Sequence, residues 1–484
     1  MKQYLVMIGF SAAVSLLAPD ALATTKAAFF FDTEDYTCDR SNDAIRDIAN
    51  ILKSEGVKGN FNVVGFLGLR LVELERFDVI EALRHHVLGT QTLYHSRHPD
   101  IAELGDDPSY ERAYRQTLAD EARGVGMLEA AFGEGRVHFA CPPGNSVSAV
   151  AIDVYSDLGI PVNAATGFYG DGHTYAHATY SSGLLVRKGA TVGGLWYFNQ
   201  YHLPYYTSFT LESLFPRSGQ GCPDFKNVLD RLAKFDFAGL YMHPHMALKL
   251  RHWDGRNYRY GNNCKWREWM QEPDRDPSDT AVFYERLRAF IKAMKADARF
   301  AITDVDQIMA EMKPRRAITR AEVPVVRAAL AKSFGPIREP ASWCVADCFQ
   351  AAVRLLRGET AYQPGKVRGF LARPRGVSAP VTVSADDLKE AAKNLDLEAF
   401  LPAEIAVGGQ VIGPADFLFA ALEVLDGGAD KVTVSPREQL GSFDEVPSLE
   451  KMNISGSWVH TKEFKDQYLS ERLRLQLWTM RFEY

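Results

Sequence analysis

Short apolar segments alternate with longer amphipathic segments from residue 26 to about residue 313, and this alternation constrains the fold more than any other feature of the chain. The apolar segments are KAAFFFDTE, VKGNFNVVG, VLGTQTLYH, VHFACPP, IPVNAATG, FAGLYMHPH and RFAITDV, and several of them end in polar residues. The segments between them place apolar residues at helical spacing. Strands that alternate with helices of this length indicate parallel βα units. The sequence therefore predicts an α/β fold, with enough units for a closed or distorted (β/α) barrel.

Local signals predict where two of the helices lie. The helix over residues 41–56 is expected to use Ser41 or Asn42 as its N-cap and to end at a glycine. Residues 71–86, LVELERFDVIEALRHH, are predicted as one continuous helix.

The chain is too long for one domain, because hydrophobic cores stop growing at about 250–300 residues and this chain has 484. We expect a catalytic domain over residues 24–313 and a mainly helical C-terminal domain over residues 314–484. We expect a two-copy repeat in the second domain, at about 318–358 and 383–427; the alternative is a chance likeness between helical segments. In this repeat, ITRAEVPVVRAAL parallels VSADDLKEAAKNL, and ADCFQAAVRLLRG parallels ADFLFAALEVLDG. Each copy is expected to open with a helix N-cap pair, Thr319 with Glu322 and Ser384 with Asp387.

Residues 1–23 are predicted to be a secretory signal peptide. A basic residue, an apolar run and the small residues ALA follow one another there. The alternative is a membrane anchor, although the apolar run is short for a membrane span. Because no later stretch is long and apolar enough to cross a bilayer, we expect a secreted or periplasmic protein that is not an integral membrane protein. The net charge of -6 argues against a general nucleic-acid-binding role.

Polar residues cluster where the predicted strands end, at the edge that carries the chemistry in parallel α/β barrels. Carboxylates and histidines that meet there favour a divalent ion such as zinc. A further carboxylate nearby would take a proton from water. Taken singly, each cluster has a simpler interpretation as a solvated loop, a turn or a histidine paired with an acid. The clusters comprise Asp32, Glu34 and Asp35; Gln91, His95 and His98; the segment 141–145; and His243 with His245.

The order of these motifs resembles that of the polysaccharide deacetylase superfamily, the NodB-homology domain of carbohydrate esterase family 4. FFFDTED resembles the spaced form of its first motif, and GVKGNFNVVG resembles its second-strand signature. GTQTLYH fits its Gly-Asn-His-Thr-x-x-His motif without a gap, and YMHPH resembles the late histidine motif. HFACPP resembles its Arg-Pro-Pro segment. The resemblance covers about residues 26–313 and implies a distorted (β/α) barrel that removes acetyl groups from sugars.

By this resemblance, Asp32 is the catalytic base and His243 the general acid. A divalent metal, expected to be zinc, would be held by three ligands, with Asp35 as a substitute for Glu34. These ligands are Glu34, Gln91 and His95. The residues expected to contact the substrate are Cys141, Pro142 and Trp253, with further aromatic residues at 198–206 as a sugar-binding wall or as ordinary packing.

Two positions depart from the family pattern. Gln91 stands where the family has a histidine, and an amide oxygen is a weaker zinc ligand than imidazole. Cys141 stands where the family has an arginine that orients the base. His98 is either a replacement ligand or simply the residue before Pro99 in a turn.

The sequence thus favours an exported metal-dependent hydrolase that removes acetyl groups from an N-acetylated cell-wall or extracellular polysaccharide. The alternatives are a glycan-binding pseudoenzyme on the same barrel and another metal-dependent hydrolase, acting on a different amide or on a glycosidic bond. The segment 401–425 of the C-terminal domain faintly resembles pseudomurein-binding repeats, which would anchor the protein to a wall polymer. A purely structural or interaction domain is the other interpretation of this region.

Overall fold

A computed structural model of the chain describes most of the barrel region and most of the C-terminal region. The described residues are 24–141, 143, 148–160, 162–163, 184–186, 206–215, 223–235, 237–311, 315–441, 459–461, 463–465 and 467–482. The predicted signal peptide, Pro142 and residues 198–205 of the expected sugar-binding wall lie outside this set. None of the helices formed by the described residues combines the length and the apolar character that a bilayer crossing requires.

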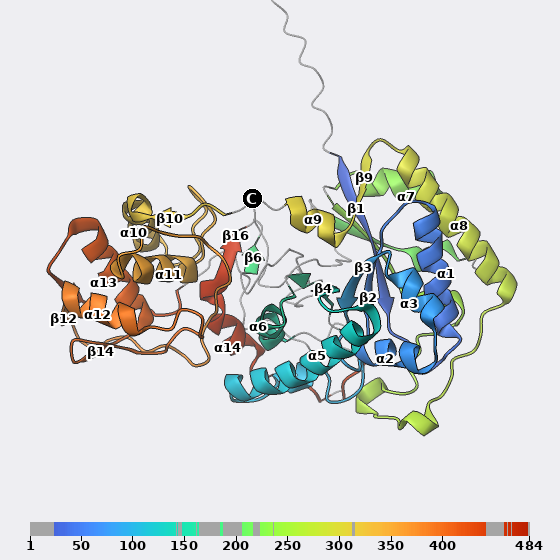
Figure 1. The fold of residues 1–484 in the computed structure, drawn as a ribbon, viewed down its shortest axis with the longest axis horizontal. Coiled ribbons are helices and arrows are strands. Elements are labelled where there is room, and N and C mark those ends of the chain that lie inside the picture. Colours follow the sequence, from blue (N-terminus) through green and yellow to red (C-terminus); the bar gives the residue numbers. More distant parts are fainter. Residues whose placement is uncertain are drawn as a thin grey trace, which may run out of the picture.

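A parallel sheet forms the centre of the N-terminal part (Figure 1). Its strand order is β5-β4-β3-β2-β1-β8-β7, and β9 pairs with the first half of β1. The α/β fold class predicted from the alternating segments is therefore confirmed. The strands are β1 (Thr25–Thr33), β2 (Asn60–Val63), β3 (Val87–Thr90), β4 (Val137–Ala140), β5 (Val162–Asn163), β7 (Tyr206–Thr210), β8 (Phe237–Met242) and β9 (Phe300–Thr303).

Helices connect these strands and cover the sheet, with α1, α3 and α8 on its outer side (Figure 1). The helices of this part are α1 (Ser41–Ser54), α2 (Gly65–Glu73), α3 (Phe77–Leu83), α4 (Ile101–Gly105), α5 (Tyr110–Phe132), α6 (Ala149–Asp157), α7 (Phe225–Leu232), α8 (Pro277–Ala296) and α9 (Val305–Glu311). Short 3-10 helices lie at Leu211–Leu214, Pro244–Ala247, Arg259–Gly261 and Trp266–Glu268.

Two predictions about these helices were wrong. The single helix expected over residues 71–86 is two helices, α2 and α3, because the chain turns at Glu75, whose φ is +54°. The N-cap of α1 is Arg40, not Ser41 or Asn42. The Ser41 hydroxyl instead donates a hydrogen bond to the Asp35 carboxylate at 2.5 Å. It therefore binds the turn before α1 and does not cap the helix backbone.

Aromatic residues of β1 fill the core on both faces of the sheet, as alternating side chains of a buried strand do. Phe31 stacks on Phe61 with ring centroids 4.5 Å apart, and Phe30 meets Phe139 edge-on at 6.1 Å. Gly89 lies against the same Phe139 ring, and a Cβ atom at this position would come within 2.6 Å of it. The glycine at the head of GTQTLYH is therefore required by packing against β4.

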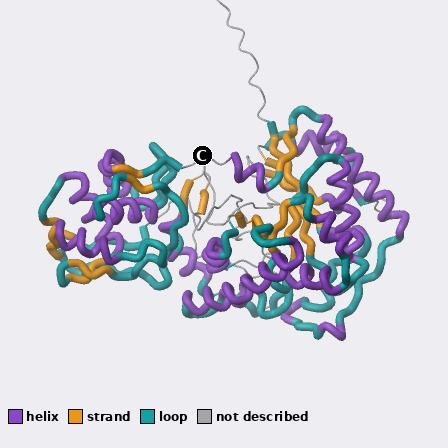
Figure 2. The backbone as a smooth tube through the Cα atoms, viewed as in Figure 1, coloured by secondary structure: helices purple, strands orange, loops and turns teal. Residues whose placement is uncertain are grey.

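The C-terminal part consists of two similar helical units with short antiparallel strand pairs (Figures 1 and 2). In each unit, the two paired strands flank two helices along the sequence. β10 pairs with β11 in the first unit, and β12 pairs with β15 in the second. The second helix of each unit begins with a buried aspartate, Asp347 or Asp416, whose side chain accepts a hydrogen bond from the backbone at the N-cap. The elements are β10 (Ile318–Thr319), α10 (Val323–Lys332), α11 (Val345–Leu356), β11 (Ala361–Tyr362), β12 (Val381–Ser384), α12 (Ala385–Asn394), β13 (Ile405–Val407), β14 (Gln410–Ile412), α13 (Pro414–Gly427) and β15 (Lys431–Val434).

Local signals placed the start of each unit correctly. Thr319 and Glu322 form the expected capping box, and the Ser384 hydroxyl accepts from the backbone N–H of Asp387. Near the end of the described residues, α14 (Leu469–Leu475) is followed by a 3-10 turn at Leu477–Thr479 and then by β16 (Met480–Phe482). β16 pairs in parallel with β6 (Leu184–Val186).

Candidate functional site

The candidate site lies at the carboxyl ends of β1, β3 and β8, which meet at one edge of the parallel sheet. Asp32 is paired in register with Asn62 of β2, and Glu34 follows β1 directly. Gln91 follows β3, and His243 follows β8. Parallel pairing brings all these strand ends to the same edge, so side chains from distant parts of the sequence converge there.

Glu34 is the centre of the cluster. Its Oε1 lies 3.2 Å from Gln91 Nε2 and 3.1 Å from His95 Nε2, and its Oε2 accepts a hydrogen bond from Trp253 Nε1 at 2.8 Å. Burial alone would raise the pKa of this carboxyl, but the neighbouring His95 and His243 outweigh burial and hold the pKa well below its usual range. Glu34 is therefore a carboxylate, and Gln91 and His95 are both directed at it.

The loop that carries His95 holds the imidazole in a fixed orientation. The Ser96 hydroxyl bridges His95 Nδ1 and the Asp254 carboxylate, so Nε2 faces Glu34. Thr92 and His95 have φ values of +64° and +58°, which are uncommon for residues with a Cβ and above all for a β-branched one. Backbone strain of this kind is concentrated at functional sites, where the surrounding structure enforces it.

Asp32 lies beside His243 at the open side of the cluster. Its Oδ1 accepts a hydrogen bond from Asn62 Nδ2 at 2.5 Å, and its Oδ2 lies 3.4 Å from His243 Nε2. Burial raises the pKa of Asp32, and the charge of Glu34 adds to this effect, although His243 opposes it. A carboxylate with a raised pKa is a better proton acceptor than an exposed aspartate.

His243 is held by Glu212, a residue that the sequence analysis did not identify. Glu212 lies in the 3-10 turn after β7, and its Oε1 accepts from His243 Nδ1 at 2.8 Å and from the His243 backbone N–H at 3.2 Å. Burial would lower the pKa of His243, but the charge of Glu34 and the hydrogen bond to Glu212 outweigh it and raise the pKa to about 10. No local motif distinguishes Glu212 in FTLESLF; only the pairing of β7 with β8 brings it to the site.

The residues predicted as metal ligands fit a divalent ion by their chemistry. The Glu34 carboxylate, the His95 imidazole and the Gln91 amide lie close together, because Glu34 Oε1 is near a nitrogen of each of the other two. The second nitrogen of His95 contacts the Ser96 hydroxyl, which donates to Asp254, and such hydroxyl or carboxylate partners typically orient a metal-binding histidine. Gln91 Oε1 is buried and has no hydrogen-bond partner among the described residues. Because amide oxygen and nitrogen are interchangeable by a turn of the side chain, Gln91 can present this oxygen to an ion.

Two further groups bring three ligand atoms within 4.8 Å of one another. They are Asp32, Glu34 and His243, and Glu212, His243 and His252. Both groups depend on His243, whose Nδ1 is already hydrogen-bonded to Glu212. The Nε2 atom of His243 lies 3.4 Å from Asp32 and 3.5 Å from Glu34, so this histidine can also face an ion, whereas an ion held by Glu34, Gln91 and His95 leaves His243 available for proton transfer.

Asp35 and His98, the two candidate substitute ligands, are hydrogen-bonded to other groups. Asp35 accepts hydrogen bonds from Thr37 and from the Ser41 hydroxyl, so it stabilises the turn before α1. His98 Nδ1 is 2.8 Å from Glu103 Oε2, and its Nε2 is 3.2 Å from the carbonyl oxygen of Tyr258. The interpretation of His98 as a turn residue fits this placement, and the interpretation as a replacement ligand does not.

The residues expected to contact the substrate are differently placed. Trp253 was expected to contact the sugar, but it is only 1% exposed and donates a hydrogen bond to Glu34. It therefore positions Glu34 from beneath the surface. Cys141 is buried at the end of β4, where burial and the nearby Asp32 and Glu34 raise the pKa of its thiol. His245 is also buried, and neither of its ring nitrogens has a hydrogen-bond partner among the described residues.

No protein-family model and no curated protein matches the chain. Among solved structures, the chain is similar to a 4-alpha-glucanotransferase from Thermococcus litoralis at 11% identity and a TM-score of 0.37, with 60% of this chain and only 41% of that one covered. A CE4 family pseudoenzyme from Bacillus anthracis is 13% identical, with coverages of 60% and 66% and a TM-score of 0.31. A family 4 carbohydrate esterase from Streptomyces lividans, in complex with acetate, is 10% identical, with coverages of 59% and 94% and a TM-score of 0.30. At such identities and scores these likenesses assign no activity to this chain.

Proposed function

We propose that this protein is a metal-dependent hydrolase that removes acetyl groups from an N-acetylated polysaccharide. One observation carries the proposal: Asp32 and His243 lie 3.4 Å apart, directly beside the carboxylate–imidazole–amide cluster of Glu34, His95 and Gln91. Cleavage of an amide by water needs a proton acceptor, a proton donor and an electrophile within reach of one carbonyl group.

Each group has a distinct part in the reaction. Glu34, Gln91 and His95 would hold the ion. When bound, a divalent ion such as zinc lowers the pKa of water and polarises a carbonyl group. Asp32 takes the proton of the attacking water, and Asn62 fixes the Asp32 carboxylate by donating a hydrogen bond to its Oδ1. His243, held by Glu212, gives a proton to the leaving amine of the sugar.

We place the substrate outside the cytoplasm because residues 1–23 have the pattern of a secretory signal peptide. A cell-wall or extracellular glycan is therefore the proposed substrate, and the protein would be secreted or periplasmic.

Acetate release tests the proposal. Purified protein with one equivalent of zinc is incubated with N-acetylated glucosamine oligomers and with peptidoglycan, and acetate is measured over time. Activity that disappears on chelation and returns with zinc would support the proposal. Absence of acetate from every N-acetylated and O-acetylated glycan, in protein shown to contain the metal, would overturn it.

A glycan-binding pseudoenzyme is the second candidate, because one observation favours it. Both oxygens of Glu34 contact neighbouring side chains, and Gln91 is a neutral and weak ligand. The distinguishing measurement is the zinc content of the purified protein together with glycan binding. Tight glycan binding by a protein that holds no metal would favour this candidate.

A further inference from the structure

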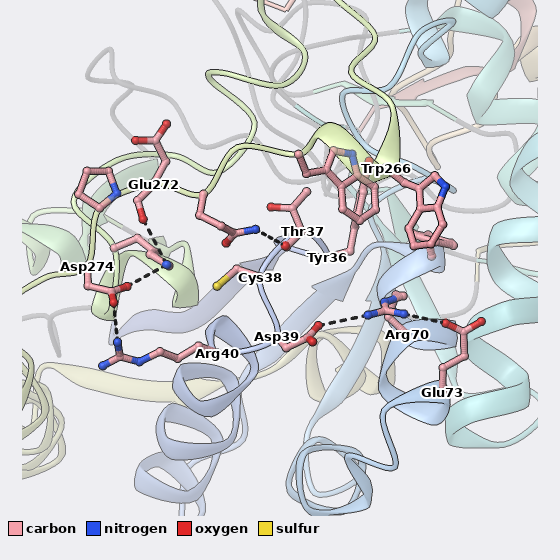
Figure 3. Close-up of a pocket in the computed structure, with 15 residues that line it drawn as sticks. Tyr36, Thr37, Cys38, Asp39, Arg40, Arg70, Glu73, Trp266, Glu272 and Asp274 are labelled. Carbon is pink, nitrogen blue, oxygen red and sulfur yellow. Dashed lines mark hydrogen bonds and ion pairs between the residues drawn. The ribbon is translucent and has the colours of Figure 1, made fainter.

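A groove of about 990 Å³ opens beside the candidate site, between the turn after β1, helix α2 and the segment 266–274 (Figure 3). Its volume lies at the upper end of the range for small-molecule sites. None of the proposed catalytic residues or metal ligands lines it. The groove is therefore a feature distinct from the site described above.

Aromatic rings form much of its wall. Trp266 is 65% exposed, which makes it the most exposed tryptophan of the described residues. Tyr36 packs edge-on against Trp269 at 5.4 Å and against Phe66 at 5.3 Å, so its ring has a fixed position. An exposed indole beside fixed rings offers flat apolar surface to a ligand that has a flat apolar face.

The charged groups of the groove are paired with one another (Figure 3). Arg40 and Lys249 both contact Asp274, at 2.5 and 2.8 Å, and Arg70 contacts Asp39 and Glu73 at 3.3 and 3.0 Å. The basic side chains that line the groove are thus neutralised by acidic ones. The groove offers many hydrogen-bonding groups but little net charge, which disfavours a phosphate or a polyanion and favours an uncharged ligand rich in hydroxyl groups.

The groove and the candidate site share one wall. The ring centroids of Tyr36 and Trp253 lie 4.7 Å apart, and Trp253 donates its indole N–H to Glu34. We propose that this groove is a second binding site for a neutral polysaccharide, in which a sugar ring stacks on Trp266 and its hydroxyl groups bind the paired charged side chains. The identity of the polymer rests on the proposed function, but binding in the groove does not require catalysis.

Affinity electrophoresis tests this proposal with soluble glycol chitin as the neutral polymer and carboxymethyl cellulose as the anionic one. The measurements use an Asp32→Asn background, so that hydrolysis does not alter the polymer. We expect glycol chitin to retard the protein, Trp266→Ala to weaken binding about tenfold and Trp266→Phe to have an intermediate effect. Phe77→Ala is the matched control, because Phe77 is an exposed aromatic residue on α3 that does not line the groove.

The outcomes separate this proposal from the proposed function. Equal retardation of Trp266→Ala and Phe77→Ala would overturn the proposal that the groove binds a polysaccharide. Stronger retardation by carboxymethyl cellulose than by glycol chitin would also overturn it. Absence of retardation by either polymer would overturn it as well. Binding that depends on Trp266, together with no acetate release by the native protein loaded with zinc, would support the proposed groove site while refuting the hydrolase.

Discussion

Gln91 is the weakest of the three side chains that we propose as ligands of a divalent ion. Its Nε2 is directed at Glu34, while its oxygen is buried without a hydrogen-bond partner among the described residues. An imidazole at this position would supply a stronger zinc ligand than an amide oxygen. In the proposed metal site, this residue is therefore expected to limit how firmly an ion is held.

Replacing Gln91 with histidine is expected to raise zinc affinity at least about tenfold, because a nitrogen ligand replaces a weak oxygen ligand. Isothermal titration calorimetry measures the affinity directly. Gln307→His on the exposed surface of α9 is the control for nonspecific binding by an added histidine. An unchanged affinity would mean that Gln91 is not part of the ion site.

Glu121 provides a test of pH dependence, because burial raises the pKa of its carboxyl from 4.5 to about 8. The folded protein keeps a proton that the unfolded chain releases. Its contribution to stability is therefore complete below pH 4.5 and is lost as the pH rises toward about 8. Glu121→Gln removes this loss, so we expect the variant to exceed the native protein in free energy of unfolding by a few kcal/mol at pH 8, and by much less at pH 5. Urea unfolding at the two pH values measures the difference, and a difference that does not grow with pH would contradict the assignment.

At the scale of the element, the strand ends bring the side chains of the candidate site together, and the loops after the strands orient them. Strand β3 ends at Thr90, and the strained loop after it turns His95 back toward Glu34. Gly89 keeps this strand close to β4, because the Phe139 ring fills the space that a side chain would need.

Gly89→Ala is expected to destabilise the protein by about 1–3 kcal/mol, since a Cβ atom 2.6 Å from the Phe139 ring forces the packing apart. Gly126→Ala is the matched control, because a Cβ atom there meets nothing within 4 Å and Gly126 lies inside α5. Alanine in a helix interior is favoured over glycine by roughly 1 kcal/mol, so the control is expected to be stabilising. Denaturant unfolding measures both, and similar stabilities of the two variants would contradict the packing argument.

The elements that could be predicted from the sequence are those that local patterns define. Alternating polarity and helical spacing located the strands that carry the site and long helices such as α5 and α8. The break between α2 and α3 could not be predicted, because the apolar spacing continues across the turn at Glu75. Asp32, Gln91 and His95 were found by motif order, and the structure brings them together, although their roles stay predictions. Glu212 was missed because its importance depends on strand pairing, which leaves no local signal.

At the scale of the whole molecule, the N-terminal part contributes residues to the hydrophobic core of the C-terminal part. Tyr110 and Ala113 of α5 and Val150 and Val154 of α6 are buried in the same cluster as the helices of the C-terminal part. Polar contacts continue this interface, since Asp157 of α6 pairs with Lys366 and Arg368. The C-terminal part is therefore expected to be necessary for the stability of the first.

The fully buried pair of Asp347 and Arg481 ties residues near the end of the described chain to α11. Both side chains are 0% exposed, and the arginine donates two hydrogen bonds to the carboxylate, at 2.8 and 2.6 Å. Removing one partner of a buried pair costs about 3–5 kcal/mol, so we expect Asp347→Asn to destabilise the protein strongly. Asp426→Asn, which breaks a more exposed pair with Arg327, is expected to cost at most about 1 kcal/mol. Thermal unfolding measures both, and equal effects would show that burial of the pair does not matter.

The pairing of β16 with β6 has a consequence for biosynthesis. A ribosome makes residues 184–186 long before residues 480–482, yet the two segments are neighbouring strands in the finished protein. Among the described residues, β6 has no other strand partner. The β6–β16 pair therefore cannot form until the whole sequence between the two strands has been translated, so β6 acquires this strand partner only after all of that sequence has been made.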